Sequence, residues 1–260
     1  MAHISYSELK EWTTCPWKHK LKYVDRINAF FGNEHTAFGT AMHTVCENIV
    51  EEKDVDLKQL FQSEFLANLQ KLKDTDSNYD FKQKLISDMR TQGEDIIEFI
   101  LPGIKSYFGS FELASVEEKL YEDIEDSDYK FKGFIDLVVK TKDGKYHVID
   151  WKTCSWGWDS RRKTDKITTY QITLYKHYWC KKHDIDPKDV NTHFALLKRT
   201  AKKNKVEFFK VTTGNKKIEN SLKLLNKAVY NIKKENFIKN KLSCHGRYGA
   251  CEFYKTKHCK

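Results

Sequence analysis

The chain has 260 residues, carries a formal net charge of +9 and is 40% hydrophobic, a composition that is sufficient for a folded core. Three Pro, 11 Gly and no Pro- or Ser-rich tract leave no obvious interdomain linker, so we expect a single domain spanning residues 1–260. No long apolar run and no secretory signal pattern are found, which predicts a cytoplasmic protein without a membrane partner.

The charge is distributed unevenly along the chain. Residues 151–260 contain 27 Lys and Arg against 9 Asp and Glu, whereas residues 1–150 contain 19 against 28. Such a basic half indicates a polyanionic partner, most simply nucleic acid. A lysine-rich surface without a partner is the alternative, because Lys outnumbers Arg by 40 to 6. That bias explains the choice of Lys over Arg but not the segregation of charge.

Residues 1–53 predict two helices. Ser5 or Ser7 can cap a short first helix, and Gly39 is expected to open a longer second one. The second helix carries an apolar stripe at helical spacing, formed by Phe38, Met42, Val45 and Ile49. His43 lies beside this stripe, where a single histidine is more often a satisfied structural residue than a metal ligand.

Residues 54–110 predict a helical insertion without a catalytic pattern. Helices are expected at Leu57–Leu72 and at Phe81–Ile100, the second closed by Pro102-Gly103. Ser115–Tyr121 is expected to be the first strand of a sheet. Its Glu117 could face a site, but the pattern favours an exposed charge.

Residues 130–152 are the most informative stretch, because they predict a β-hairpin that carries two carboxylates and a lysine. The Asp-Gly pair at 143–144 is a strong turn signal between two runs of β-branched and aromatic residues. Side chains alternate across a strand, so Asp150 and Lys152 point to one face of the second arm. Asp136 lies on the first arm, three residues after Gly133.

Metal-assisted hydrolysis of a phosphodiester fits this hairpin. Asp136 and Asp150, on adjacent strands, can converge on one Mg²⁺ ion, which prefers carboxylate oxygens. The ammonium of Lys152 can orient the attacking water or offset charge in the transition state. The alternative is an edge hairpin with a solvated cross-strand ion pair. The flanking Val-Ile and Val-Val runs weaken that alternative, because they place the carboxylates inside an apolar sheet.

The basic half begins with a polar loop at residues 153–166, in which two Trp alternate with basic residues. This composition suits contacts to the phosphates and bases of a nucleic acid strand, although such loops also occur for structural reasons. Lys166–Lys181 predicts a helix that carries Gln171 and Tyr175 on one face. The remaining predicted elements are strands at Asn191–Arg199 and Lys205–Val211 and a final amphipathic helix at Lys216–Lys239.

The cysteines suggest a second metal centre. Seven Cys in a chain without an export signal argue against disulfides. Cys244, Cys251 and Cys259 lie within the last 17 residues, and Cys15 is the candidate for a fourth ligand. Four thiolates suit tetrahedral Zn²⁺ or an iron–sulfur cluster equally well. Unconnected reduced thiols are the alternative.

Four short motifs occur in a fixed order: Gly39-x-x-x-His43, Gly133-x-x-Asp136, Asp150-x-Lys152 and Gln171-x-x-x-Tyr175. This set resembles the RecB-type branch of the PD-(D/E)XK nucleases. The opening Ser-Tyr-Ser-x-Leu-x-x-Trp-x-x-Cys-Pro is similar to that branch as well. One Cys before the core and three after it resemble its iron–sulfur members, which include CRISPR-adaptation, AddB-type and phage nucleases. The resemblance runs from about residue 5 to residue 259, with residues 54–110 excepted.

The resemblance implies a fold and a set of roles. The fold would be α/β, with a restriction-endonuclease-like core whose central mixed β-sheet is flanked by helices. Residues 54–110 would be an N-terminal helical insertion and the C-terminal end a Cys-rich metal-cluster segment. The ligands of Mg²⁺ or Mn²⁺ would be His43, Asp136, Asp150 and the carbonyl of Trp151. The catalytic set would be Asp136, Asp150, Lys152, Gln171 and Tyr175, with Lys152 positioning or activating the water and Gln171 and Tyr175 holding the DNA backbone or bracing the site.

The resemblance also implies a [4Fe–4S] cluster, with Zn²⁺ as the alternative, that staples the two ends of the chain together. Its ligands would be Cys15, Cys244, Cys251 and Cys259. One departure concerns the spacing of the last three cysteines. Six and seven residues separate them here, whereas the family commonly has two and five.

The activity implied by the resemblance is that of a divalent-metal-dependent deoxyribonuclease. It would be an exonuclease that hydrolyses single-stranded DNA from its ends in recombination, repair or phage DNA processing, in a bacterial cytoplasm or in that of a phage host. A helicase or recombination partner would remain to be identified. The alternative is a non-cutting DNA-binding or scaffold subunit that keeps the fold and the cluster. The intact set of His43, Asp136, Asp150 and Lys152 argues against it.

Overall fold

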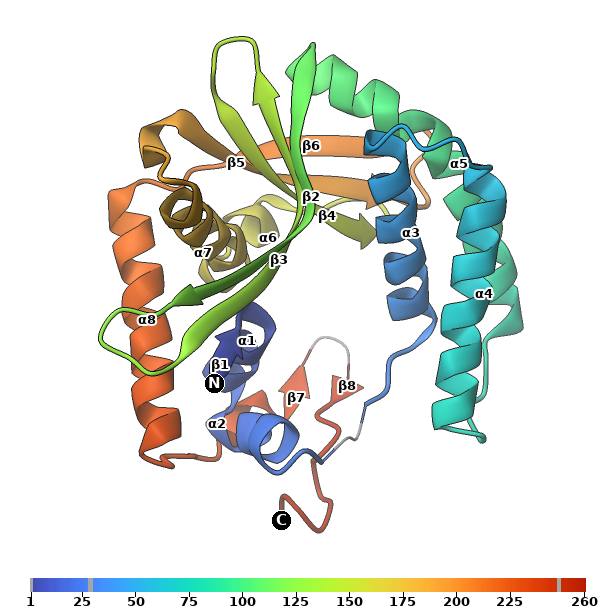
Figure 1. Ribbon diagram of the computed structural model, residues 1–260. Helices are drawn as coiled ribbons and strands as arrows, with labels where there is room; N and C mark the ends of the chain where they lie inside the picture. The colour runs from blue at the N-terminus through green and yellow to red at the C-terminus, as the bar shows by residue number, and fades with distance from the viewer. Residues whose placement is uncertain (1, 28–29, 247–248) are drawn as a thin grey trace. The chain divides into compact units, whose positions relative to one another are not determined.

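The structure is a computed structural model that describes the chain except for residues 1, 28–29 and 247–248 (Figure 1). The chain divides into two compact units. Unit 1 comprises Met1–Phe31, Leu120–Gly133 and Asn215–Lys260. Unit 2 comprises Gly32–Lys119 and Phe134–Gly214. A single domain for residues 1–260 stays a prediction. No helix among the described residues is long and apolar enough to cross a membrane.

Unit 2 is built on a mixed sheet. Strand β3 (Lys130–Thr141) pairs antiparallel with β4 (Tyr146–Cys154), and the predicted turn joins them, with Gly144 at a φ of 81°. β4 pairs in parallel with β5 (Val190–Lys198), which pairs antiparallel with β6 (Val206–Val211). β2 (Phe111–Asp123) also pairs with β3. The parallel pair is joined through α6 (Ser160–Thr164), α7 (Lys166–His183) and the short η2 (Pro187–Asp189).

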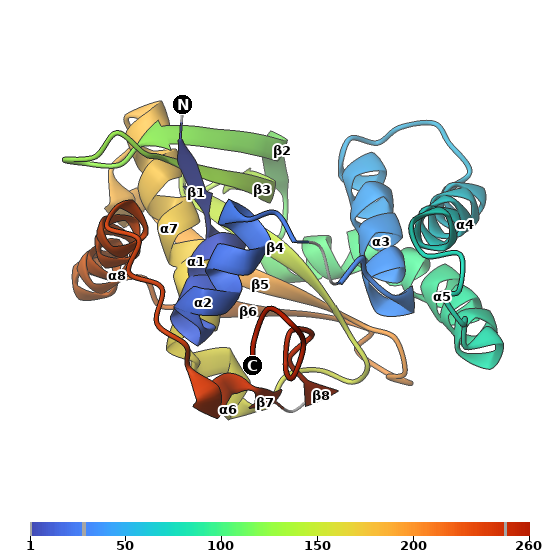
Figure 2. The same ribbon diagram turned by 90° about the horizontal axis from the view of Figure 1, so that it is seen from below.

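Helices cover both faces of this sheet. The long helices α3 (Glu34–Val50), α4 (Leu57–Thr75) and α5 (Gln83–Phe108) lie together on one face (Figures 1 and 2). Because side chains alternate along β4, Ile149 and Trp151 enter the core under these helices, whereas Tyr146 and Asp150 contact α7 on the other face. The predicted central mixed sheet flanked by helices is therefore confirmed.

Two predicted helix boundaries in unit 2 are wrong. α3 begins at Glu34 instead of Gly39, because Asn33 caps it by accepting hydrogen bonds from the next turn. α5 does not end at Pro102 but continues to Phe108. The burial of Ile104 and the ring contacts of Phe108 with the histidines of β4 and β5 offset the backbone hydrogen bond that proline cannot make.

Unit 1 is formed by the two ends of the chain. Strand β1 (His3–Ser5) pairs in parallel with residues 130–132 of β3, so the strand expected to come first in the chain is in fact the second. α1 (Tyr6–Thr14), with Ser5 as its N-cap, contacts α8 (Asn215–Lys233). The other elements are α2 (Pro16–His19), π-helical η1 (Lys20–Val24), η3 (Lys241–Ser243), β7 (His245–Gly246) and β8 (Gly249–Ala250).

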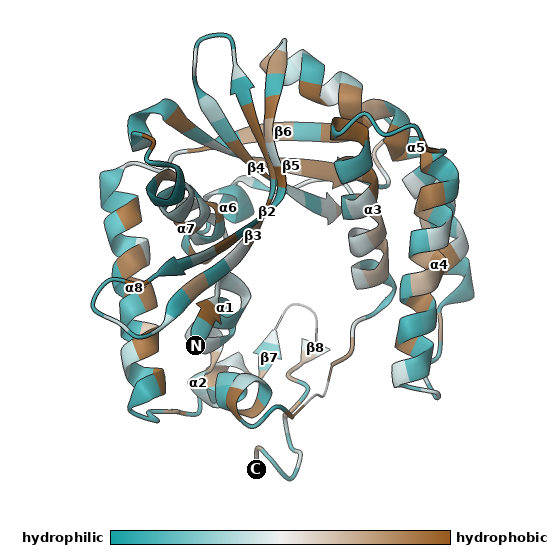
Figure 3. Cartoon of the chain, in the orientation of Figure 1, coloured by the Kyte–Doolittle hydropathy of each residue, from teal (hydrophilic) through white to brown (hydrophobic). Residues whose placement is uncertain are grey.

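The last helix, α8, is amphipathic as predicted but shorter than expected. Hydrophilic and hydrophobic bands alternate along it (Figure 3), and its inner face includes Leu225 and Val229. It ends at Lys233 instead of Lys239, because the chain turns at Glu235, which has a φ of 55°. The carbonyl of Ile238 then accepts a hydrogen bond from the Trp17 backbone at 3.2 Å. The residues after α8 are therefore used to hold the start of α2.

Candidate active site and metal centre

The candidate active site lies where the pairing of β3 and β4 ends. Leu137 and Ile149 are the last paired residues, so Asp136 and Asp150 occupy the next position on the two strands. Here the backbone N–H of Trp151 donates to Oδ2 of Asp136 at 2.6 Å instead of to a backbone carbonyl of β3. Both carboxylates are buried. The register of the hairpin therefore brings together the two acids that the sequence predicted.

Asp150 is contacted by two of the other predicted residues, and a third contacts one of these two. Nζ of Lys152 lies 2.5 Å from Oδ2 of Asp150, as expected for side chains two positions apart on one strand. Nε2 of Gln171 donates to Oδ1 of Asp150 at 2.8 Å and lies 3.3 Å from the hydroxyl of Tyr175. Gln171 and Tyr175 lie one turn apart on α7. The Asp-x-Lys and Gln-x-x-x-Tyr motifs thus meet at one carboxylate.

His43 and Glu117 complete a second group around Asp136. Nδ1 of His43, on α3, lies 3.5 Å from Oδ1 of Asp136. The possible ligand atoms of His43, Glu117 and Asp136 all lie within 4.8 Å of one another. Two carboxylates and an imidazole suit a divalent cation such as Mn²⁺, and the oxygens suit Mg²⁺. The residues present therefore fit the implied metal.

Glu117 belongs to the site, although the sequence pattern favoured an exposed charge at this position. It has a φ of 46° within β2, a conformation that is rare for a residue other than glycine. Val116 packs against the core under α3, whereas Glu118 accepts a hydrogen bond from Trp179 on α7. In a regular strand these two residues would share a face. The irregular backbone breaks the alternation and turns Glu117 toward His43, and no sequence pattern indicates it.

The site is electrostatically crowded. Loss of hydration, together with the charge of Asp136, raises the pKa of Glu117 to about 7, although its side chain is partly open to solvent. Burial raises the pKa of Asp150 to about 6, and the nearby Lys152 opposes this change. Burial is the strongest single influence on His43 and acts to lower its pKa, but the charge and hydrogen bond of Asp136, together with the charge of Asp150, raise the pKa overall. Negative charge gathered in this way favours binding of a cation.

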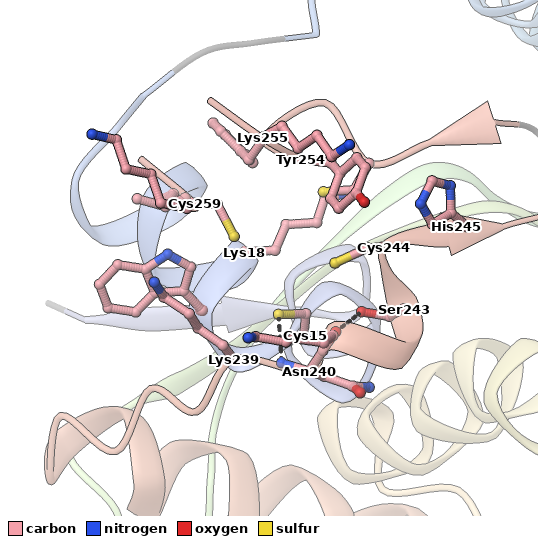
Figure 4. Close-up of a pocket in the computed structure, with 16 residues that line it drawn as sticks. Cys15, Lys18, Lys239, Asn240, Ser243, Cys244, His245, Tyr254, Lys255 and Cys259 are labelled. Atoms are coloured by element: carbon pink, nitrogen blue, oxygen red, sulfur yellow. Dashed lines mark hydrogen bonds between the residues drawn. The ribbon is translucent and has the colours of Figure 1, made fainter. Parts of the chain in front are cut away.

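Unit 1 contains a cavity of about 380 Å³ that is lined by all four cysteines implied as cluster ligands, namely Cys15, Cys244, Cys251 and Cys259. The side chains of Cys15, Cys244 and Cys259 point toward one shared space (Figure 4). The backbone N–H of Asn240 donates to Sγ of Cys15 at 3.3 Å, and that of Cys251 donates to the carbonyl of Cys244 at 2.8 Å. Segments more than 200 residues apart in sequence thus enclose one thiol-lined space.

The spacing of these thiols has a chemical consequence. In the part of the chain that the structure describes, no three possible ligands that include these cysteines lie within 4.8 Å of one another. A tetrahedral Zn²⁺ site with Zn–S bonds of about 2.3 Å would place its sulfurs roughly 3.8 Å apart. The sulfurs are therefore not spaced as in a preformed tetrahedral Zn²⁺ site. By donor type the four thiols suit either Zn²⁺ or an iron–sulfur cluster.

The chain belongs to the PD-(D/E)XK nuclease superfamily, whose family model matches residues 3–256. The match includes the β3–β4 hairpin, His43, α7 and three of the four cavity cysteines, Cys15, Cys244 and Cys251. It assigns the sheet and its flanking helices to the restriction-endonuclease-like fold predicted from the sequence. The chain is thus a member of a nuclease superfamily.

One solved structure that resembles this chain agrees with this fold. A protein from Eubacterium rectale that is assigned as an exonuclease superimposes with a TM-score of 0.59 at 11% sequence identity, over 97% of this chain and 86% of that one. A second structure, of the protein SSO0001, has a TM-score of 0.35 and 14% identity over 73% of this chain and 84% of that one, and it carries no weight. No curated protein matches the chain.

Proposed function

We propose that this protein is a divalent-metal-dependent deoxyribonuclease that hydrolyses single-stranded DNA from its ends. The observation that carries the proposal is the convergence of His43, Asp136, Asp150 and Lys152 at the end of the β3–β4 pairing. Membership of the nuclease superfamily and the assignment of the Eubacterium rectale protein as an exonuclease support it. Recombination, repair or phage DNA processing is the proposed setting, with a helicase or recombination partner still to be identified.

The side chains have separable roles in this proposal. His43, Asp136, Asp150 and the carbonyl of Trp151 would hold Mg²⁺ or Mn²⁺, with Glu117 as a further donor. The bound ion would supply Lewis-acid stabilisation of the phosphate. Lys152 would position the attacking water and favour its deprotonation, because its ammonium stabilises negative charge nearby. Gln171 and Tyr175 would fix the orientation of Asp150, which Gln171 already contacts at 2.8 Å.

We also propose that Cys15, Cys244, Cys251 and Cys259 bind a [4Fe–4S] cluster. Support comes from the shared cavity and from the backbone N–H that donates to the Cys15 sulfur. Hydrogen bonds to ligand sulfurs tune such clusters and help to hold the ligands in place. The cluster would join the N- and C-terminal segments of unit 1 and would take no part in hydrolysis.

A digestion assay tests the proposed activity. Single- and double-stranded oligonucleotides labelled at either end are incubated with the wild type in Mg²⁺, in Mn²⁺ or with a chelator. We expect stepwise shortening of the single strand only when a metal is present. Asp150→Asn should abolish it, whereas Asp54→Asn, at an exposed position outside the site, should not. Metal-dependent binding without any cutting would instead support the non-cutting scaffold subunit.

A further inference from the structure

The loop between β4 and α6 contains two tryptophans in opposite environments. Trp158 is 7% exposed and packs on the rings of Phe194 and Phe209. Trp156 is 79% exposed. The burial of Trp158 is explained by the core of unit 2, but the folded state gains little from an indole left in solvent. Trp156 therefore calls for an explanation other than folding.

Backbone contacts hold this loop in place. The carbonyl of Cys154 accepts from the Arg199 backbone at 2.9 Å, and the carbonyl of Ser155 accepts from the backbone and the hydroxyl of Thr200 at 2.8 and 2.9 Å. On the other side of Trp156, Gly157 has a φ of 126°, which requires glycine, and Trp158 packs on Phe194 and Phe209. The loop that carries the exposed Trp156 ring is therefore held in place on both sides of this residue.

Basic residues flank the exposed ring on both sides. Arg161 and Arg162 follow it on α6, and Lys202 and Lys203 lie in the turn that starts at Thr200, next to Ser155. All four side chains are exposed, and none forms an ion pair with a carboxylate of the described residues. The guanidinium of Arg162 lies 4.3 Å from the centre of the Trp158 ring. In contrast, the nearby Lys163 and Lys198 both form ion pairs with Glu207. The surface around Trp156 therefore combines an aromatic face with unneutralised positive charge.

The exposed ring lies close in sequence to the candidate active site. Trp156 follows Lys152 by four residues, so their Cα atoms can be at most about 14 Å apart. A nucleic acid strand whose phosphate is bound at Asp150 and Lys152 can therefore reach the indole within a few nucleotides. Aromatic rings stack on unpaired bases of any sequence, while cations contact the phosphates between them.

We propose that Trp156 is a stacking platform for an unpaired base of the DNA strand, a few nucleotides from the bond that is cut. This inference rests on the proposed nuclease function and adds a binding residue to it. The pairing of an exposed indole with Arg161, Arg162, Lys202 and Lys203 favours a single strand over a duplex, because the faces of paired bases are covered by their stacked neighbours.

The test measures binding separately from cutting. Fluorescence anisotropy with a labelled single-stranded oligonucleotide, in the presence of a chelator, compares the wild type with Trp156→Ala and Trp156→Phe. Tyr230→Ala serves as control, since Tyr230 is a 61% exposed aromatic residue in unit 1. We expect a roughly tenfold higher Kd for Trp156→Ala, a smaller change for Trp156→Phe and none for the control. Equal Kd values for Trp156→Ala and the wild type would overturn the inference.

An abasic scan locates the stacked base. Oligonucleotides that lack one base at successive positions are bound to the wild type and to Trp156→Ala. One position should weaken binding by the wild type but not by the variant, because the stacking partner is already missing. An abasic penalty that is the same in both proteins at every position would contradict the proposal. If the wild type shows an abasic penalty that Trp156→Ala lacks but never cuts DNA, the nuclease function is overturned and the role of Trp156 is not. If the wild type cuts DNA but shows no such penalty, only the role of Trp156 is overturned.

Discussion

The two candidate metal centres of this protein are assembled in opposite ways. At the carboxylate site, Asp136, Asp150 and Lys152 come from one hairpin. The register of its two strands is sufficient to bring them together without a contact from a helix. In the cysteine cavity, Cys15 lies with Cys244, Cys251 and Cys259, which are in short elements or loops. A sheet positions its ligands without a metal, whereas loops at chain ends gain order from the metal they bind. We therefore expect loss of a carboxylate-site residue to affect chemistry and loss of a cluster cysteine to affect folding.

The largest expected effect is on catalysis. Lys152→Ala should reduce the single-turnover rate of DNA cutting by about a hundredfold or more, because it removes a charge that acts on the reacting groups. DNA binding and the melting temperature should change little, since the Lys152 side chain is 29% exposed. Lys142→Ala, at an exposed position of the same hairpin, is the matched control. A Lys152→Ala protein that cuts at the wild-type rate would refute the assignment of the site.

The second prediction concerns the cysteine cavity of unit 1. Cys15→Ser should lower the melting temperature by several degrees and reduce solubility, because a cluster contributes its binding free energy to folding. Cys154→Ser, in unit 2, should not. Differential scanning fluorimetry and iron and sulfide analysis of protein purified without oxygen check this. Brown protein that contains iron is expected. Colourless protein that contains zinc would show that the four cysteines bind Zn²⁺ instead of an iron–sulfur cluster. Protein without either metal would show that they are unconnected thiols.

A smaller effect is expected at Glu117. Glu117→Gln keeps the shape of the side chain but removes one anionic oxygen from the group around Asp136, so we expect roughly a tenfold loss of activity at limiting Mg²⁺. Excess Mg²⁺ should restore part of it. Glu112→Gln, exposed on the same strand, is the control. An identical Mg²⁺ titration for Glu117→Gln and the wild type would show that the proximity of Glu117 to His43 has no role in metal binding.

The smallest and most specific effect is expected at His43. Imidazole nitrogen suits Mn²⁺ better than Mg²⁺, and excess Mn²⁺ can compensate for other weakened contacts. His43→Ala should therefore lose more activity in Mg²⁺ than in Mn²⁺, with a change of a few fold in the ratio of the two rates. The ratio is measured in parallel reactions. If the ratio stays the same while the melting temperature falls, His43 is a structural residue, as its place beside an apolar stripe first suggested.

Much of the candidate site follows from the sequence, because the determining interactions are local. The Asp-Gly turn fixes the hairpin, the period of two aligns Asp150 with Lys152, and the helical period aligns Gln171 with Tyr175. Helix ends were harder to predict. Pro102 indicated an end to α5, yet packing of Ile104 and Phe108 carried the helix past it. Local preference gave way there to burial that only the folded chain provides.

Three features were decided by tertiary structure. Glu117 reaches His43 through an irregular backbone, and strand alternation gives no sign of this. Trp156 and Trp158 are two residues apart in one polar loop, yet only contact with Phe194 and Phe209 determines which of them is buried. The cavity around Cys15 depends on contacts of Cys15 and Trp17 with Ile238, Asn240 and His258. Periodicity reports on neighbours along a single element, whereas these features depend on residues that become neighbours only after folding.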